Sequence, residues 1–118
     1  MPKLTDQELH NLAMNIVGKQ LEEDGFEFLG VSSEFKKDPQ FVALKNKKLH
    51  FVIVRAIEYP HDPKEIPYIF LETIKEHAKK FNARTFYAGV GLANSRDYEL
   101  PVDSSDDYVV NYAGLQEI

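Results

Sequence analysis

The sequence predicts a single α+β domain, residues 1–118, in which two helices pack a mostly antiparallel central sheet. The first observation is an apolar run at residues 49–57, which a strand buries only when both of its faces are covered. The second is a capped helical pattern before that run, and the third is another helical pattern after it. The expected element order is therefore α-β-β-β-α-β-β.

The composition is that of an ordinary globular protein, with 43% hydrophobic and 28% charged residues in 118. The chain contains no cysteine, which excludes disulfides, thiolate metal sites and cysteine nucleophiles. We expect a cytoplasmic protein, because cytosolic proteins have no use for structural disulfides. We also expect no cofactor.

The chain gives no indication of a membrane or nucleic-acid partner. No apolar run approaches the roughly 18 residues that span a bilayer, and the start MPKLTDQELH lacks the apolar core of a signal peptide. The formal charge of −5 disfavours binding to phosphate backbones and anionic lipid. The cluster of Lys45, Lys47 and Lys48 is interpreted as a solvated hairpin tip.

A first helix is predicted over residues 6–24. Thr5 is a suitable N-cap, and Glu8 completes a capping box with it. Gly25 is a natural C-terminal stop, after which Phe26 folds back on Leu21. The stripe that follows helical spacing is Leu9, Leu12, Ala13, Ile16, Val17 and Leu21.

Three strands are predicted next, over residues 26–31, 40–45 and 49–57. The last two form a hairpin, in which Asn46 and Lys47 occupy the turn. Pro67 restricts the second helix to residues 68–81, because its ring clashes with a preceding helical turn. The apolar stripe of this helix is expected to begin at Ile69 or Phe70.

Two further strands are predicted over residues 85–92 and 108–112, and the tail GLQEI is expected to be loose. On the first of these strands, Tyr87, Gly89 and Gly91 share one face. Two glycines on one face let a helix, a partner or a ligand approach the backbone closely. The six tyrosines lie outside the main apolar stripes, and tyrosine is favoured at protein interfaces. Tyr87, Gly89 and Gly91 are therefore candidate binding residues.

Arg55 and Glu58 are the remaining candidates. Arg55 ends an apolar run, and buried arginines are usually paired, so Glu58 or Glu27 is its expected partner. The alternative is that Arg55 contacts a bound anion.

No catalytic or metal-binding constellation is predicted. The element order is similar to that of restriction-endonuclease-like folds, whose strands carry an acidic residue and an acid-x-lysine motif that hold a divalent metal. Here Ile53 occupies the acid position before Arg55, and Asp38 lies just before the second strand. Convergence of carboxylates from separate elements, Glu8, Glu27, Asp38 and Glu58, remains open. The order also resembles that of small acidic secretion-chaperone-like domains.

Four segments, residues 18–30, 38–46, 49–56 and 80–95, resemble a family of short uncharacterised bacterial proteins. Members of that family often carry the label of the sodium-translocating NADH:quinone reductase, as its flavin-containing component. A genuine component of that kind has a membrane helix, a cysteine-ligated [2Fe–2S] domain and flavin and NADH domains. The present chain matches none of those motifs, so the resemblance implies a bacterial origin and little about mechanism.

The favoured interpretation is a non-enzymatic binding or self-associating module with a homodimeric or other protein partner. The alternatives are a degenerate nuclease-like enzyme domain and a protein associated with NADH:quinone reductase. Enzymatic activity is not decided by the sequence, although the missing catalytic constellation argues against it.

Overall fold

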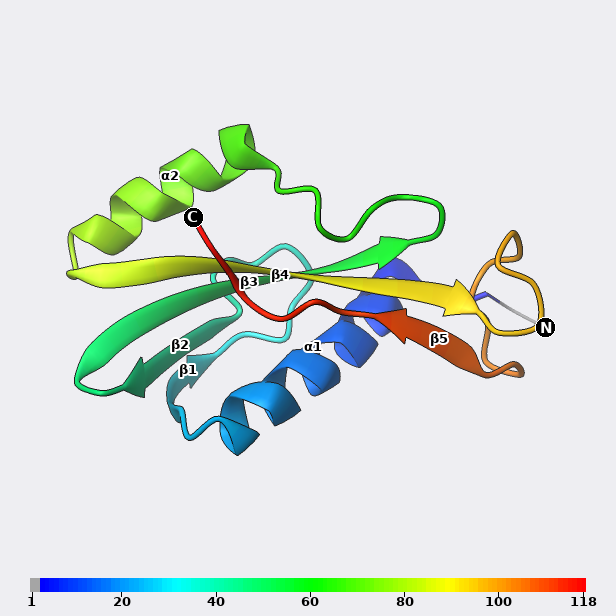
Figure 1. Cartoon of the computed structure of the whole chain (residues 1–118), viewed down its shortest axis with the longest axis horizontal. Coiled ribbons are helices and arrows are strands. Elements are labelled where there is room, and N and C mark those ends of the chain that lie inside the picture. Colours follow the sequence, from blue (N-terminus) through cyan, green and yellow to red (C-terminus); the bar gives the residue numbers. More distant parts are fainter. Residues whose placement is uncertain (1–2) are drawn as a thin grey trace.

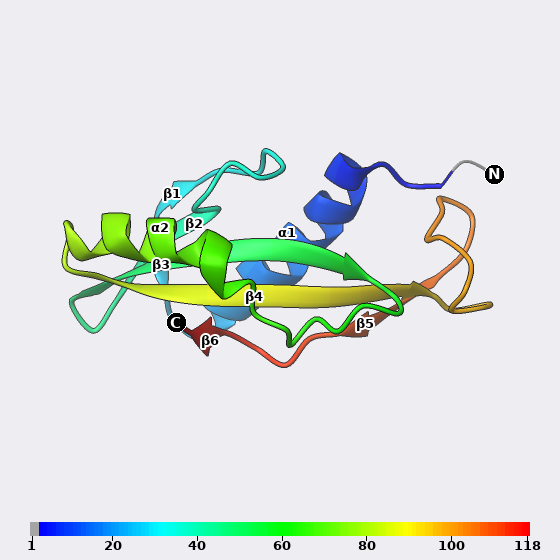
Figure 2. The ribbon, with the colours of Figure 1, turned by 90° about the horizontal axis from the view of Figure 1, so that it is seen from above.

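The computed structural model describes residues 3–118, so Met1 and Pro2 of the predicted domain lie outside the described part. The structure is mixed α+β, with two helices and a six-stranded, mostly antiparallel sheet, as predicted. The strand order is β1-β2-β3-β4-β5, and β6 also pairs with β4. Helix α1 packs on one face of the sheet and α2 on the other (Figures 1 and 2). The molecule is elongated, measuring 45 × 29 × 22 Å.

Helix α1 (Asp6–Glu23) begins and ends through the signals that the sequence predicts. Thr5 and Glu8 form the reciprocal capping box. Gly25 adopts a φ of 85°, and the amide of Phe26 donates to the carbonyl of Leu21 at 3.0 Å. The helix ends one residue earlier than predicted.

Strands β1 (Glu27–Val31), β2 (Phe41–Lys45) and β3 (Lys48–Glu58) form an antiparallel meander. Asn46 and Lys47 both have positive φ, of 52° and 64°, which is the geometry of a two-residue hairpin turn. In the middle of β3, Val52 and Ile53 are fully buried on opposite faces. The prediction of a strand sealed on both sides is therefore confirmed.

Helix α2 (Tyr68–Lys79) connects β3 to β4 (Ala83–Asn94), which runs parallel to β3. A crossover helix returns the chain to the same end of the sheet, and this makes the pair parallel. The predicted stripe of α2 was wrong in its start: Leu71, Ile74 and Ala78 face the sheet, whereas Ile69 is 93% exposed. Leu71 takes the place that was assigned to Ile69 or Phe70.

The carboxyl-terminal tail is not loose, and that prediction was wrong. After β5 (Tyr108–Asn111), residues Gln116–Glu117 form β6 against β4. Glu117 accepts two hydrogen bonds from Arg84, at 2.6 and 2.7 Å. The amide of Ile118 donates to the carbonyl of Thr85, and its side chain packs against the smaller core cluster. A two-residue strand carries no readable alternation, so sequence periodicity could not reveal it.

The two faces of the sheet are covered unequally. The α1 face carries the larger core, which includes Val52, Val54 and Val90. The α2 face carries a smaller cluster of Ile53, Leu71 and Tyr87, and α2 lies over the amino-terminal half of β4 (Figure 1). The proline-rich segment, residues 59–67, runs over the carboxyl-terminal half of the strand pair. Neither helix of the described residues is long and apolar enough to cross a membrane.

Candidate functional site

Arg55 is held in a largely buried ion pair, but its partner is not the one predicted. Its guanidinium donates to both carboxylate oxygens of Asp38, at 2.8 and 2.7 Å. The two side chains are only 12% and 10% exposed. The ring of Phe70 stacks on the guanidinium at 4.8 Å, a cation–π contact. The expected pairing with Glu58 or Glu27 was wrong, because the loop before β2 places Asp38 beside Arg55.

Gln40 fixes the geometry of this ion pair. Its side-chain amide donates to Asp38 Oδ1 at 2.8 Å and to the carbonyl of Lys37 at 3.1 Å. Its side-chain oxygen accepts from the amide of Val54 at 2.7 Å. Gln40 is fully buried, so each of these polar atoms needs a protein partner and has one. The ion pair is thus a rigid structural joint between the loop before β2 and strand β3.

The glycine face of β4 is occupied by the chain itself. A Cβ atom on Gly89 would lie 2.1 Å from the carbonyl oxygen of Pro63, and one on Gly91 would lie 3.0 Å from Pro63 Cγ. The close approach that the two glycines predicted is therefore made by the proline-rich segment. Tyr87, on the same face, is buried in the cluster with Ile53 and Leu71, and burial raises the pKa of its phenol.

A hollow of about 280 Å³ opens beside Pro63, at the carboxyl ends of β3 and β4. Its floor is formed by Ile57, Gly91, Ala93 and Val109, from three neighbouring strands. Tyr59 and Tyr98 form its walls, with ring centroids 5.4 Å apart and ring planes at 61°. The polar lining residues are His61 and Asn111. We call this hollow the tyrosine cleft.

The tyrosine cleft adjoins a free sheet edge. All four residues of β5 are exposed, and among residues 3–118 no strand pairs with its outer side. Val109 and Asn111 belong both to β5 and to the lining of the cleft. The cleft and the outer edge of β5 therefore form one continuous surface.

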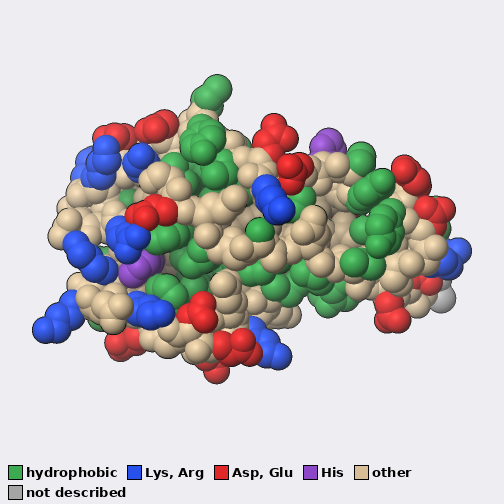
Figure 3. Space-filling model, in the orientation of Figure 1, with side chains coloured by type: hydrophobic (Ala, Val, Ile, Leu, Met, Phe, Trp, Pro, Cys, Tyr) green, Lys and Arg blue, Asp and Glu red, His purple; other side chains and the backbone are tan. Residues whose placement is uncertain are grey.

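Two loops border this surface and carry most of the acidic excess of the chain. We call residues 58–65 and 95–107 the acidic loops; Tyr59 lies in the first and Tyr98 in the second. Figure 3 shows hydrophobic side chains at this end of the molecule among acidic ones, with basic side chains gathered at the opposite end. The basic end includes Lys45, Lys48 and Arg84. In the second loop, hydrogen bonds from Ser105 lower the pKa of Asp103.

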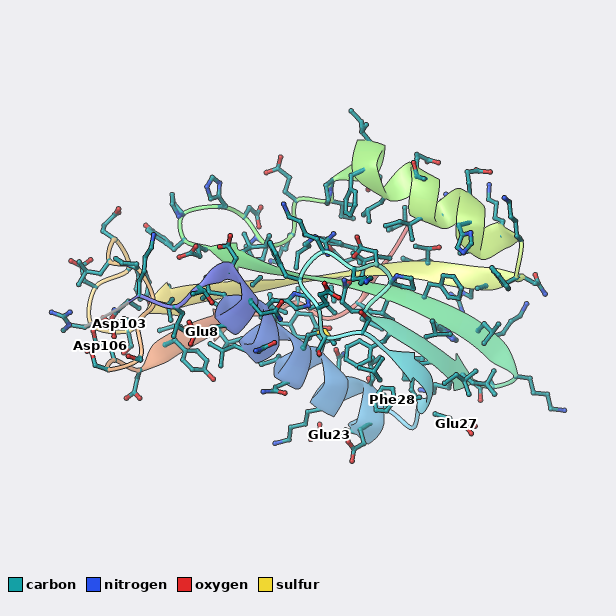
Figure 4. The ribbon with its side chains drawn as sticks, turned by 180° about the vertical axis from the view of Figure 1, so that it is seen from behind. Glu8, Glu23, Glu27, Phe28, Asp103 and Asp106 are labelled. Atoms are coloured by element: carbon teal, nitrogen blue, oxygen red, sulfur yellow. The ribbon has the colours of Figure 1, made fainter. Side chains whose placement is uncertain are left out.

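The other carboxylates considered as ligands do not come together. Figure 4 shows Glu8 and Glu27 near opposite ends of α1, and Asp103 and Asp106 in the loop after β4. Glu58 is exposed at the end of β3, and Asp38 is bound to Arg55. In residues 3–118, no three histidine or acidic side chains are grouped closely enough to hold a metal ion.

A buried histidine, which the sequence did not single out, lies near the ion pair. His10 on α1 is fully buried, and neither ring nitrogen has a hydrogen-bond partner. Its ring meets that of Phe35 edge to face, with centroids 5.8 Å apart. Burial lowers the pKa of His10, and the charge of Arg55 lowers it further, partly offset by Asp38. His10 is therefore held neutral inside the core.

Sequence reasoning found the tyrosines and the residues of β4, but it missed the tyrosine cleft. Tyr59 and Tyr98 are far apart in the chain and meet only because β3 and β4 are parallel and end side by side. Comparison with known proteins gives a match over residues 7–118 to the model of a family described as a domain of unknown function, DUF8840. No curated protein and no solved structure matches the chain. The chain belongs to the DUF8840 family.

Proposed function

We propose that this protein is a non-enzymatic binding module that takes an extended segment of a protein partner along β5. The observation that carries the proposal is the tyrosine cleft, an apolar hollow with two half-exposed aromatic walls beside an unpaired strand edge. Aromatic residues are enriched at protein interfaces, where one side of the ring is dry and the hydroxyl is wet.

The shape of the surface favours an extended segment over a compact ligand. A hollow of about 280 Å³ lies below the usual range for whole small-molecule sites and is large enough for one side chain. An added strand forms main-chain hydrogen bonds with a free edge, and alternate side chains of that strand enter pockets on one face. Val109 and Asn111 present the edge and the cleft on the same face.

A degenerate nuclease-like enzyme is the weaker alternative. The element order supports a restriction-endonuclease-like core, with a meander followed by a crossover to a parallel strand. In such enzymes acidic side chains on β2 and β3 hold a divalent metal. Here Asp38 gives both oxygens to Arg55, and the acid position before Arg55 is the buried hydrocarbon of Ile53. These residues suit a structural joint better than a metal site.

A redox role in NADH:quinone reductase also has little support. The sequence has no cysteine for an iron–sulfur cluster, and the tyrosine cleft with its free strand edge suits protein recognition better than electron transfer. We place the protein in the bacterial cytoplasm, on the strength of its resemblance to short bacterial proteins and its lack of cysteine.

The proposal is tested by selecting a random 12-residue peptide library on the immobilised full-length protein. We expect enrichment of defined sequences, and loss of binding of the selected peptides to Tyr98→Ala. The Tyr68→Ala variant is the matched control, because Tyr68 is a similarly exposed tyrosine on α2, away from the cleft. Absence of any enriched sequence, or equal binding to both variants, would refute the proposed function.

A further inference from the structure

We infer that the segment bound at the tyrosine cleft is basic, with a lysine or arginine side chain lying against the rings of Tyr59 and Tyr98. The inference rests on the proposed function and names the chemistry of the partner. Three properties of the surface support it: the geometry of the two rings, the apolar floor and the charge of the surrounding loops.

The two rings form an aromatic corner that is accessible from outside. Their planes meet at 61°, and the side chains are 46% and 49% exposed, so ring surface faces the hollow as well as the neighbouring ring. The face of an aromatic ring carries negative electrostatic potential and attracts ammonium and guanidinium groups. A corner of two rings offers a cation more of this surface than a single exposed tyrosine does.

The floor of the cleft suits the stem of a long basic side chain. Ile57, Ala93 and Val109 provide apolar surface below the rings. Lysine and arginine pack their methylene stems on such surface while the charged head reaches a polar or aromatic group at the rim. A basic side chain therefore uses both parts of the cleft, whereas a purely aliphatic one leaves the ring faces unused.

The acidic loops supply long-range attraction for a cation. They contain eight of the 19 acidic residues of the chain and two of its 14 basic residues, so the remaining chain, with 11 acidic and 12 basic residues, is close to neutral. One of the two basic residues, Arg96, pairs with Asp106 at 3.0 Å. The acidic residues are Glu58, Asp62, Glu65, Asp97, Glu99, Asp103, Asp106 and Asp107. A field of one sign steers oppositely charged partners toward the surface and repels acidic ones.

A separate partner fits this surface better than a second copy of the chain. The basic end of the molecule carries its lysines on the hairpin tip, where Asn46 and Lys47 both have positive φ. A tight turn of that kind cannot lie as an extended strand along β5. The occupant is therefore an extended, lysine- or arginine-bearing segment of another protein.

The same peptide selection tests the inference separately from the proposed function. We expect the enriched sequences to share a lysine or arginine at one fixed position. Replacement of that lysine by norleucine, which keeps the stem and removes the charge, should weaken binding about 5- to 30-fold in a fluorescence anisotropy titration. Tyr98→Leu should remove this difference between the two peptides, and 500 mM salt should reduce it.

Each other outcome contradicts a defined part of the inference. Enriched peptides that depend on Tyr98 but lack a basic position would overturn the inference and leave the proposed function standing. No enrichment would overturn both. Self-association in light scattering that is abolished by Tyr98→Leu and also by Lys47→Glu would overturn the assignment to a separate partner, because a second copy would then be the occupant.

Discussion

At the scale of single residues, the pair of Arg55 and Asp38 shows which part of a buried charge the sequence can predict. An arginine at the end of an apolar strand needs an acidic partner, and that need was predicted. The identity of the partner depends on how the loop before β2 folds back, which neither periodicity nor spacing encodes. Asp38 lies 17 residues from Arg55 in sequence, whereas the expected partner Glu58 lies three residues away.

Removing one member of this pair should be costly, because the other charge would stay buried without a partner. We expect Asp38→Asn to lower the free energy of unfolding by about 3 kcal/mol, measured by urea denaturation. The control is Glu76→Gln, which breaks an ion pair with Lys79 whose side chains are 64% and 60% exposed and should cost less than about 1 kcal/mol. Equal effects of the two substitutions would contradict a structural role for the Arg55 pair.

The buried His10 should make stability fall as the solution is acidified. Because burial lowers the pKa of the folded state below the ordinary 6.5, the unfolded chain binds the proton more readily. The free energy of unfolding should therefore decrease as pH falls below about 6.5, by at most about 1.4 kcal/mol per pH unit from this group. His10→Leu should show a shallower decrease between pH 7 and pH 5 in urea titrations. Identical slopes would show that His10 is charged, or solvated, in the folded protein.

At the scale of elements, the strands and helices followed from the sequence, and the contacts between segments did not. The capping box, the hairpin turn and the sealed strand β3 are local patterns, and each was predicted within one or two residues. Strand β6 and the stripe of α2 depend on which neighbours the sheet offers. The two glycines of β4 correctly indicated a close approach, but the approaching segment is the chain's own Pro63.

The packing of Pro63 on Gly89 gives a direct test at this scale. In Gly89→Ala the new Cβ would meet the carbonyl oxygen of Pro63 at 2.1 Å, so the backbone of the proline-rich segment must move. We expect a loss of about 1–3 kcal/mol in unfolding free energy and faster tryptic cleavage after Lys64. Gly30→Ala is the control, because its nearest neighbour atom, on Val42, lies 3.8 Å away. Unchanged cleavage in Gly89→Ala would contradict the packing described.

At the scale of the whole molecule, two asymmetries converge on one end. Helix α2 covers only half of its face of the sheet, which leaves the carboxyl ends of β3 and β4 to a loop and the tyrosine cleft. The acidic loops lie at the same end, whereas basic residues lie at the other (Figure 3). The net charge of −5 was read from the sequence as a reason to exclude nucleic acid. Its placement around an aromatic corner could not be read there, because it depends on the parallel pairing of β3 and β4.

Hydrogen–deuterium exchange of the full-length protein, with and without a library-selected peptide, is the measurement that tests the central claim most directly. The free edge of β5 and the tyrosine cleft should gain protection together, because an added strand would hydrogen-bond to the amides of Tyr108–Asn111 and cover Tyr59 and Tyr98. Exchange in α1 should stay unchanged. Protection that appears elsewhere, or a bound peptide that leaves β5 exchanging at its original rate, would contradict the account.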